Sequence, residues 1–150
     1  YSISEKYQVG FEYALALFGY NSNIYNVNYK MDYTHHKPSV LVYRVIAGNG
    51  YKFKFGLGIG PRIVQLTESI GATEQGAQQF STTGFGLLSK VQGHTKLSEK
   101  FFANIGTTVS YDAPGEPENN VSTLINTVTN ENVNINSFSI SINIGISYFF

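Results

Sequence analysis

The sequence predicts an all-β protein, and three observations support this prediction. Apolar residues alternate with small or polar ones at a period of two in every extended stretch, as expected when successive side chains of a strand point to opposite faces. The composition includes 11 Tyr and 11 Phe, and aromatic residues favour strands. No comparable stretch shows helical spacing. We therefore expect a single β domain over residues 1–150.

Seven segments carry the alternation and are the predicted strands. The predicted strands are 7–20, 24–34, 40–48, 51–68, 82–92, 101–112 and 138–150. In the last of them, Phe138 and every second residue after it are aromatic or aliphatic, and most of the residues between are Ser, Asn or Gly. The turns between segments are rich in Asn, Gly and Ser, which tolerate the backbone angles of tight turns.

The predicted connections are of two kinds. Short turns are expected at 20–23, at Gly48-Asn49-Gly50 and at about 94–100. Longer polar connections are expected at 34–39, 69–80 and 113–134. Chain reversals after every strand indicate an antiparallel sheet with neighbouring strands connected in sequence order.

The bulky face of each strand is predicted to point outward, because a small barrel has room inside only for modest side chains. On 24–34 this face is assigned to Tyr29, Met31 and Tyr33, and on 40–48 to Leu41 and Tyr43. Most strand glycines lie on the opposite face, where they suit a crowded interior. Tyr and Phe also gather near strand ends, as in the aromatic girdles of membrane barrels.

Charged residues of the strands are predicted to share the glycine face and to form a lumen charge cluster. Its members are Glu12, Lys30, Asp32, Arg44, Lys52, Lys54, Arg62, Lys90 and Asp112. A Lys or Arg facing lipid at the bilayer midplane costs roughly 2–4 kcal/mol, so a membrane barrel turns such residues inward. The cluster could gate a pore or hold a polar ligand, but mutual neutralisation in a filled lumen is the favoured interpretation.

The C-terminal residues carry a family resemblance. Phe150 is preceded at alternate positions by Ile142, Ile144, Ile146 and Tyr148. Together with the two-faced strands, this pattern resembles the small outer-membrane β-barrels of Gram-negative bacteria, such as the OmpA membrane domain, OmpX and PagP. The resemblance implies that the last strand is an assembly signal read by the barrel-assembly machinery. It also implies a signal peptide removed on export, short periplasmic turns, and contact with outer-membrane lipids.

The resemblance further implies a closed, transmembrane, up-and-down antiparallel barrel of about eight strands. Barrels of this kind have an even number of strands, whereas seven segments are recognised. The remaining strand is expected on the N-terminal side or within 121–129. Because basic residues outnumber acidic ones in the lumen cluster by six to three, a missing strand is predicted to supply an inward Asp or Glu.

Composition excludes several function classes. Ten basic and ten acidic residues balance, and only 13% of residues are charged, which argues against binding to nucleic acid. The absence of cysteine excludes disulfides, thiol nucleophiles and thiolate metal sites. No metal site and no cofactor are predicted.

Two loops are candidates for chemistry or binding. His35 and His36 are predicted in an outer loop near Ser39. Because some enzymes of the family use His with Ser or carboxylates at the outer rim, a lipid or peptide hydrolase or acyltransferase is one alternative; solvated loop side chains are favoured. The connection 113–134 offers a surface for a protein partner, since loops on a rigid scaffold often carry binding function.

The favoured function is therefore non-enzymatic. The sequence predicts an integral β-barrel of the bacterial outer membrane, with a polar lumen filled by side chains. It would act as a membrane-anchored scaffold or as a surface-binding protein through its outer loops. Besides the rim enzyme, a soluble ligand-binding barrel of the lipocalin type remains an alternative.

Overall fold

The computed structural model describes residues 4–24, 27–71, 77–126 and 129–148, and this part of the chain is all-β, without a helix. The long strands are β1 (Tyr7–Ile24), β2 (Val27–Gly48), β3 (Tyr51–Ile70), β4 (Gln78–Lys96), β5 (Phe101–Ala113) and β8 (Ser137–Tyr148). Two short strands, β6 (Ile125–Asn126) and β7 (Glu131–Asn132), form a separate small hairpin.

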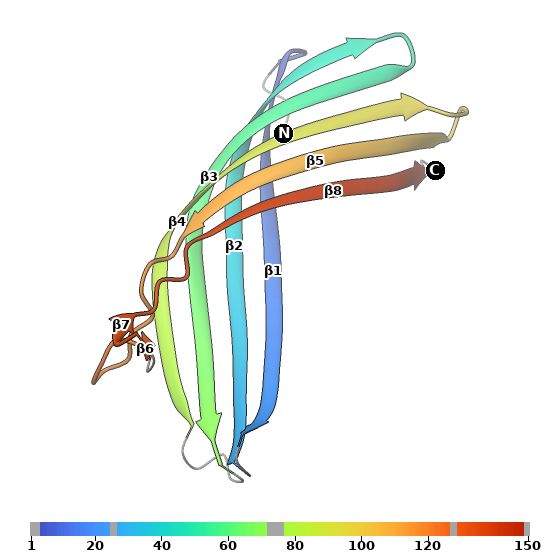
Figure 1. The fold of residues 1–150 in the computed structure, drawn as a ribbon. Helices are drawn as coiled ribbons and strands as arrows, with labels where there is room; N and C mark the ends of the chain where they lie inside the picture. The colour runs from blue at the N-terminus through green and yellow to red at the C-terminus, as the bar shows by residue number, and fades with distance from the viewer. Residues whose placement is uncertain (1–3, 25–26, 72–76, 127–128, 149–150) are drawn as a thin grey trace.

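The six long strands form one antiparallel sheet in the order β1-β2-β3-β4-β5-β8, which curls into a half-barrel (Figure 1). Strands β1 and β8 are its two edges. The turns β2–β3 and β4–β5, the start of β1 and the end of β8 lie at one end of the sheet, which we call the terminus end. The opposite end, with the β3–β4 connection, is the loop end.

Strand β2 corrects the predicted strand count. The segments 24–34 and 40–48 are parts of one strand, and the predicted connection 34–39 does not exist. The register runs from His36 opposite Ile63 to Val40 opposite Ile59 without an inserted residue. The long strands therefore number six, which places the start of β1 and the end of β8 at the same end of the sheet.

Two further expectations about strands and turns are wrong. The turn predicted at 20–23 lies inside β1, where Asn23 pairs with Asn28 and their side chains hydrogen bond at 3.0 Å. Of the candidate strand 121–129, the described residues place only Ile125–Asn126 in a strand, and it pairs with β7 rather than with the large sheet. Asn-rich sequences tolerate both turns and strand pairing, so their composition alone does not decide between the two.

The sheet bends sharply near the middle of its long strands, at the level where β5 ends and β8 begins (Figure 1). Pro38 and Pro61 lie in the gap of the β2–β3 ladder, because proline has no N–H to donate. Side chains are excluded where the strands approach closely: a Cβ on Gly60 would collide with the carbonyl of Pro38, and one on Gly84 with the carbonyl of Ala113. We call this row of residues the bend.

The bend divides the sheet into two unequal parts. Toward the terminus end all six strands are paired, and we call this part the six-stranded half. Toward the loop end only β1–β4 continue, and we call this part the four-stranded half. The connection between β5 and β8 packs beside the four-stranded half, where Ser81 and Glu118 form an isolated bridge.

The register fixes which residues share a face. On β3, the apolar residues Phe53, Phe55 and Leu57 are exposed on the convex face, and Gly56 and Arg62 are buried on the concave face. The predicted outward orientation of the bulky residues therefore describes β3. On β2 it is wrong: Leu41, Tyr43 and Val45 are buried on the concave face, where Leu41 and Tyr43 pack with Leu88.

Candidate functional site

Ion pairs between distant strands identify the concave face as the place where charges meet. Lys90 on β4 pairs with Glu12 on β1, although two other strands separate them in the sheet. Side chains of such strands can reach each other only across the inside of the curl. Their carboxylate and ammonium groups are partly buried, which strengthens the pairing relative to an exposed site.

The most buried charges form a cluster at the bend, which we call the Asp112 cluster. Asp112 accepts hydrogen bonds from the Arg62 guanidinium and from Lys37 Nζ, the latter at 2.8 Å. Asp112 is 0% exposed and Arg62 is 1% exposed, whereas the Lys37 side chain is 21% exposed. A buried charge is tolerated only when it is paired and hydrogen bonded, and these three residues meet that condition for one another.

Arg62 also compensates for the prolines at the bend. Its Nη1 lies 3.2 Å from the carbonyl oxygen of Pro38, 3.0 Å from that of Pro61 and 3.3 Å from that of Gly60. These carbonyls lie where the ladder loses donors, and a guanidinium offers several N–H groups in a fixed plane. A Cβ on Gly86 would collide with the guanidinium, so the glycine provides the space that Arg62 occupies.

The structure places six of the nine predicted lumen charges on the concave face. They are Glu12, Lys52, Lys54, Arg62, Lys90 and Asp112. The other three, Lys30, Asp32 and Arg44, lie on the convex face and are corrections to the prediction. The error arises because β2 was read as two segments. In both segments the outward face was assigned to the odd-numbered residues, which in the structure face inward. Lys30 and Asp32 pair with each other at 2.8 Å, each about half exposed.

Sequence reasoning missed Lys37, because the interval 34–39 was read as a loop. Within the continuous strand β2, Lys37 has the same parity as Leu41 and Tyr43, which face the inside of the curl. An unbroken reading of β2 would thus have placed it on the concave face. The proline that follows it was the misleading signal.

His35 and His36 are also strand residues rather than solvated loop residues, which corrects the prediction. His35 is 2% exposed, and its Nδ1 lies 3.0 Å from the hydroxyl of Tyr33. His36 faces the opposite way, and its Nδ1 lies 2.6 Å from the hydroxyl of Tyr13. Within the described ranges, no serine or carboxylate hydrogen bonds either ring, so the arrangement is not a catalytic triad.

The residues of the predicted assembly signal lie on the edge strand β8. Ile142, Ile144 and Ile146 are 70%, 81% and 72% exposed on the convex face. The backbone of Tyr148 pairs with Phe101; Phe150 lies outside the described residues. The last strand therefore presents a nearly continuous aliphatic row to the surroundings.

On β2, β3 and β4 the polarity of the convex face changes at the bend, whereas on β1 Leu15 and Leu17 remain exposed on this face beyond it. In the six-stranded half, its exposed side chains are mostly large and apolar: Val40, Val42, Ile46, Phe53, Phe55, Leu57, Ile59, Phe85, Leu87, Val91, Ile105, Phe138, Ile140, Ile142, Ile144 and Ile146. In the four-stranded half, β2, β3 and β4 instead turn mostly polar residues to the convex face: Asn28, Lys30, Asp32, Thr34, Gln65, Thr67, Ser69, Gln79, Ser81 and Thr83. There the buried apolar residues, Val64, Leu66 and Phe80, lie on the concave face.

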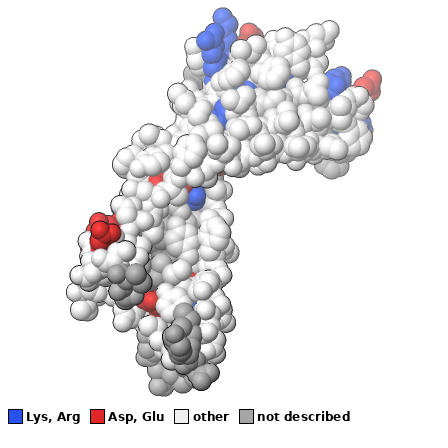
Figure 2. All heavy atoms as spheres, in the orientation of Figure 1, with Lys and Arg blue, Asp and Glu red and all other residues white. Residues whose placement is uncertain are grey.

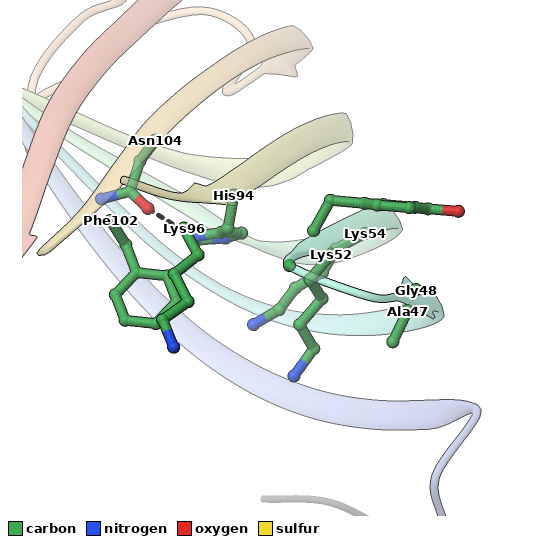
Figure 3. A pocket seen from close by; sticks show the side chains of 10 residues that line it. Ala47, Gly48, Lys52, Lys54, His94, Lys96, Phe102 and Asn104 are labelled. Carbon is green, nitrogen blue, oxygen red and sulfur yellow. Dashed lines mark hydrogen bonds between the residues drawn. The ribbon is translucent and has the colours of Figure 1, made fainter. Parts of the chain in front are cut away.

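A pocket opens on the concave face at the terminus end, and we call it the lysine pocket. It has a volume of about 520 Å³. Its lining includes Lys52 and Lys54 from β3, His94 and Lys96 from β4, and Asn104 from β5. The amino groups of the three lysines point to the same side of the sheet (Figure 3). In the view of Figure 2, basic atoms predominate toward the terminus end and acidic atoms toward the loop end.

Comparison with protein-family models, curated proteins and solved structures finds no match to this chain. Among the described residues, no helix has the length and apolar character needed to cross a membrane. The same part of the chain contains no group of three or more His, Cys, Asp or Glu placed to hold a metal ion.

Proposed function

We propose that this sheet is most of the wall of a transmembrane β-barrel in the bacterial outer membrane, which serves as a membrane-anchored scaffold or surface-binding protein. The observation that carries the proposal is the change of polarity at the bend. On β2, β3 and β4 the convex face is apolar over one half and mostly polar over the other, which is what a sheet needs when one half contacts lipid and the other contacts water.

The dimensions of the six-stranded half support this proposal. Strands β5 and β8 have 13 and 12 residues and lie wholly in this half. A tilted strand needs about 9–11 residues to cross the hydrocarbon core. The longer strands β1–β4, of 18 to 22 residues, extend past the bend into water. This arrangement also accounts for Lys30 and Asp32 on the convex face, since they lie in the half outside the lipid. The third convex charge, Arg44, lies in the six-stranded half, four residues before β2 ends at Gly48 at the terminus end.

The two edges of the sheet require partners in this environment. Unpaired backbone N–H and C=O groups in lipid cost several kcal/mol each, and β1 and β8 are edges of the described sheet. The proposal therefore includes further strands between β8 and β1, which would complete a barrel of about eight strands.

The interior supports a scaffold rather than a channel. Glu12 with Lys90, and Asp112 with Arg62 and Lys37, place two groups of paired charges on the concave face between the lysine pocket and the four-stranded half. The Asp112 cluster lies level with the bend, which is where the proposed membrane ends. The polar four-stranded half and the β5–β8 connection are then the parts that stand outside the membrane and are free to bind other molecules.

Fractionation tests the proposal. The chain, exported with a signal peptide in a Gram-negative host, is expected in the outer-membrane fraction and to migrate faster on a detergent gel before boiling than after. A soluble barrel of the lipocalin type would instead remain in the aqueous fraction without detergent, and that result would refute the proposal. The rim-enzyme alternative receives no support from the hydrogen bonds of His35 and His36.

A further inference from the structure

We infer that the lysine pocket is a binding site for a small, soluble, multiply charged oxyanion of the phosphate type. The pocket gathers three ammonium groups and an imidazole on one side of the sheet (Figure 3). Among the described residues, no Asp or Glu lines it. The remaining charges of the concave face are organised differently, in pairs between acid and base.

The lysines of the pocket have no carboxylate partner in the described part of the chain. The ion pairs found there involve Lys30, Lys37, Arg62 and Lys90, and none includes Lys52, Lys54 or Lys96. Lys54 is partly buried, and its Nζ lies 6.0 Å from the centre of the Tyr43 ring. Neighbouring cations repel each other, and an anion bound between them removes that repulsion.

His94 provides a second, independent feature. Its Nδ1 is hydrogen bonded to Oδ1 of Asn104, and its Nε2 is buried without a hydrogen-bond partner. Because an amide oxygen only accepts, Nδ1 must carry the proton in that hydrogen bond. Nε2 is then the ring nitrogen left without a partner beside the three ammonium groups.

The position of the pocket selects a soluble anion over a lipid headgroup. The lining residues lie on the concave face, whereas the apolar side chains proposed to meet lipid lie on the convex face of the same strands, as Phe53 and Phe55 do beside Lys52 and Lys54. Ammonium groups bind phosphate through charge-assisted hydrogen bonds. The opening at the terminus end would admit the anion from the aqueous phase.

The test is a titration of the full chain, folded in zwitterionic detergent, with inorganic pyrophosphate, followed by calorimetry or by ³¹P NMR. Wild-type protein is expected to bind. Lys52→Met and Lys54→Met are each expected to weaken binding at least fivefold, whereas the control Lys30→Met, on the convex face near the loop end, should change it less than twofold. Far-UV circular dichroism verifies that each variant retains its β structure.

Two results would overturn the inference. One is an absence of pyrophosphate binding at millimolar concentration, as expected if carboxylates on closing strands already neutralise the pocket. The other is equal binding by the pocket variants and the control, which would show a non-specific charge effect.

A second experiment adds anionic phospholipid to the micelles. Retained pyrophosphate binding supports a soluble anion as the ligand, and loss of pyrophosphate binding assigns the pocket to lipid headgroups instead. The inference rests on the proposed function, but fractionation tests the location of the protein separately. An absence of pyrophosphate binding can therefore be distinguished from failure of the membrane proposal.

Discussion

Replacing Asp112 by Asn tests whether the Asp112 cluster stabilises the bend. The substitution keeps the size of the side chain but removes the charge that neutralises Arg62, which is 1% exposed. Breaking a buried ion pair by removing one partner costs about 3–5 kcal/mol, because the other charge stays buried and uncompensated. Lys37 is 21% exposed and can turn its ammonium toward water, so most of the loss is expected from Arg62.

The matched control is Asp32→Asn. It removes the acidic partner of Lys30 from a pair in which both side chains are about half exposed. Exposed pairs contribute about 0–1 kcal/mol, so this variant should be close to wild type. Adding Lys37→Met to Asp112→Asn should give little further change. Adding Arg62→Met removes the uncompensated charge but also the donors to the bend carbonyls, so stability should stay below that of the wild type.

The free energy of unfolding is best measured by far-UV circular dichroism in urea, on protein folded in micelles. The chain contains no Trp, so the usual indole fluorescence is not a probe. A loss of about 3–5 kcal/mol corresponds to a change in the folding equilibrium of at least a hundredfold. A loss below about 1 kcal/mol, or a loss equal to that of Asp32→Asn, would refute the assignment of a buried, mutually dependent cluster.

Three further substitutions test other parts of the structure. Gly86→Ala places a methyl group against the Arg62 guanidinium and should cost about 1–3 kcal/mol of unfolding free energy, whereas Gly145→Ala, which meets nothing within 4 Å, should cost much less. Leu57→Lys, on the 71% exposed side chain of the convex face, should destabilise the membrane-inserted protein by about 2–4 kcal/mol, measured by urea unfolding in lipid vesicles. Gly50→Ala, at a φ of 80° in the β2–β3 turn, should cost about 1 kcal/mol in the same assay used for Asp112.

Each of these predictions has an outcome that contradicts it. Equal stability of the Gly86 and Gly145 variants would show that Arg62 does not fill the space beside Gly86. A Leu57→Lys protein as stable in vesicles as wild type would argue against contact between the convex face and lipid. A stable Gly50→Ala protein would show that the turn can adopt another conformation.

Alternation predicted the fold class and the faces of most strands because their two faces differ plainly in composition. On β3, aromatic and aliphatic residues occupy one face and glycine and lysine the other, up to the bend. On β2 the same method failed, because residues 40–48 are apolar on both faces: Val42 and Ile46 on one, Leu41 and Tyr43 on the other. Only the register with neighbouring strands decides such a case.

The candidate site was predictable in its residue types but not in its pairings. Arg62 and Asp112 were both expected to face inward, yet 50 residues separate them in sequence, and their contact depends on how tightly the sheet curls. The contact between Lys37 and Asp112 was missed because Pro38, the next residue after Lys37, indicated a loop. The lysine pocket likewise depends on curvature that brings β3, β4 and β5 around a common space.

The contacts of Arg62 with Pro38 and Pro61 have a consequence for how the corner of the sheet can be altered. At that corner, the Arg62 side chain supplies hydrogen-bond donors that the main chain lacks. A single substitution can therefore weaken the contacts that hold the angle between the two halves. Arg62→Lys would keep a cation beside Asp112 but lose the planar guanidinium, whose Nε bonds Asp112 while its Nη1 lies beside the carbonyls of the bend. The two halves would stay connected by the continuous strands β1–β4, and their relative tilt would become adjustable.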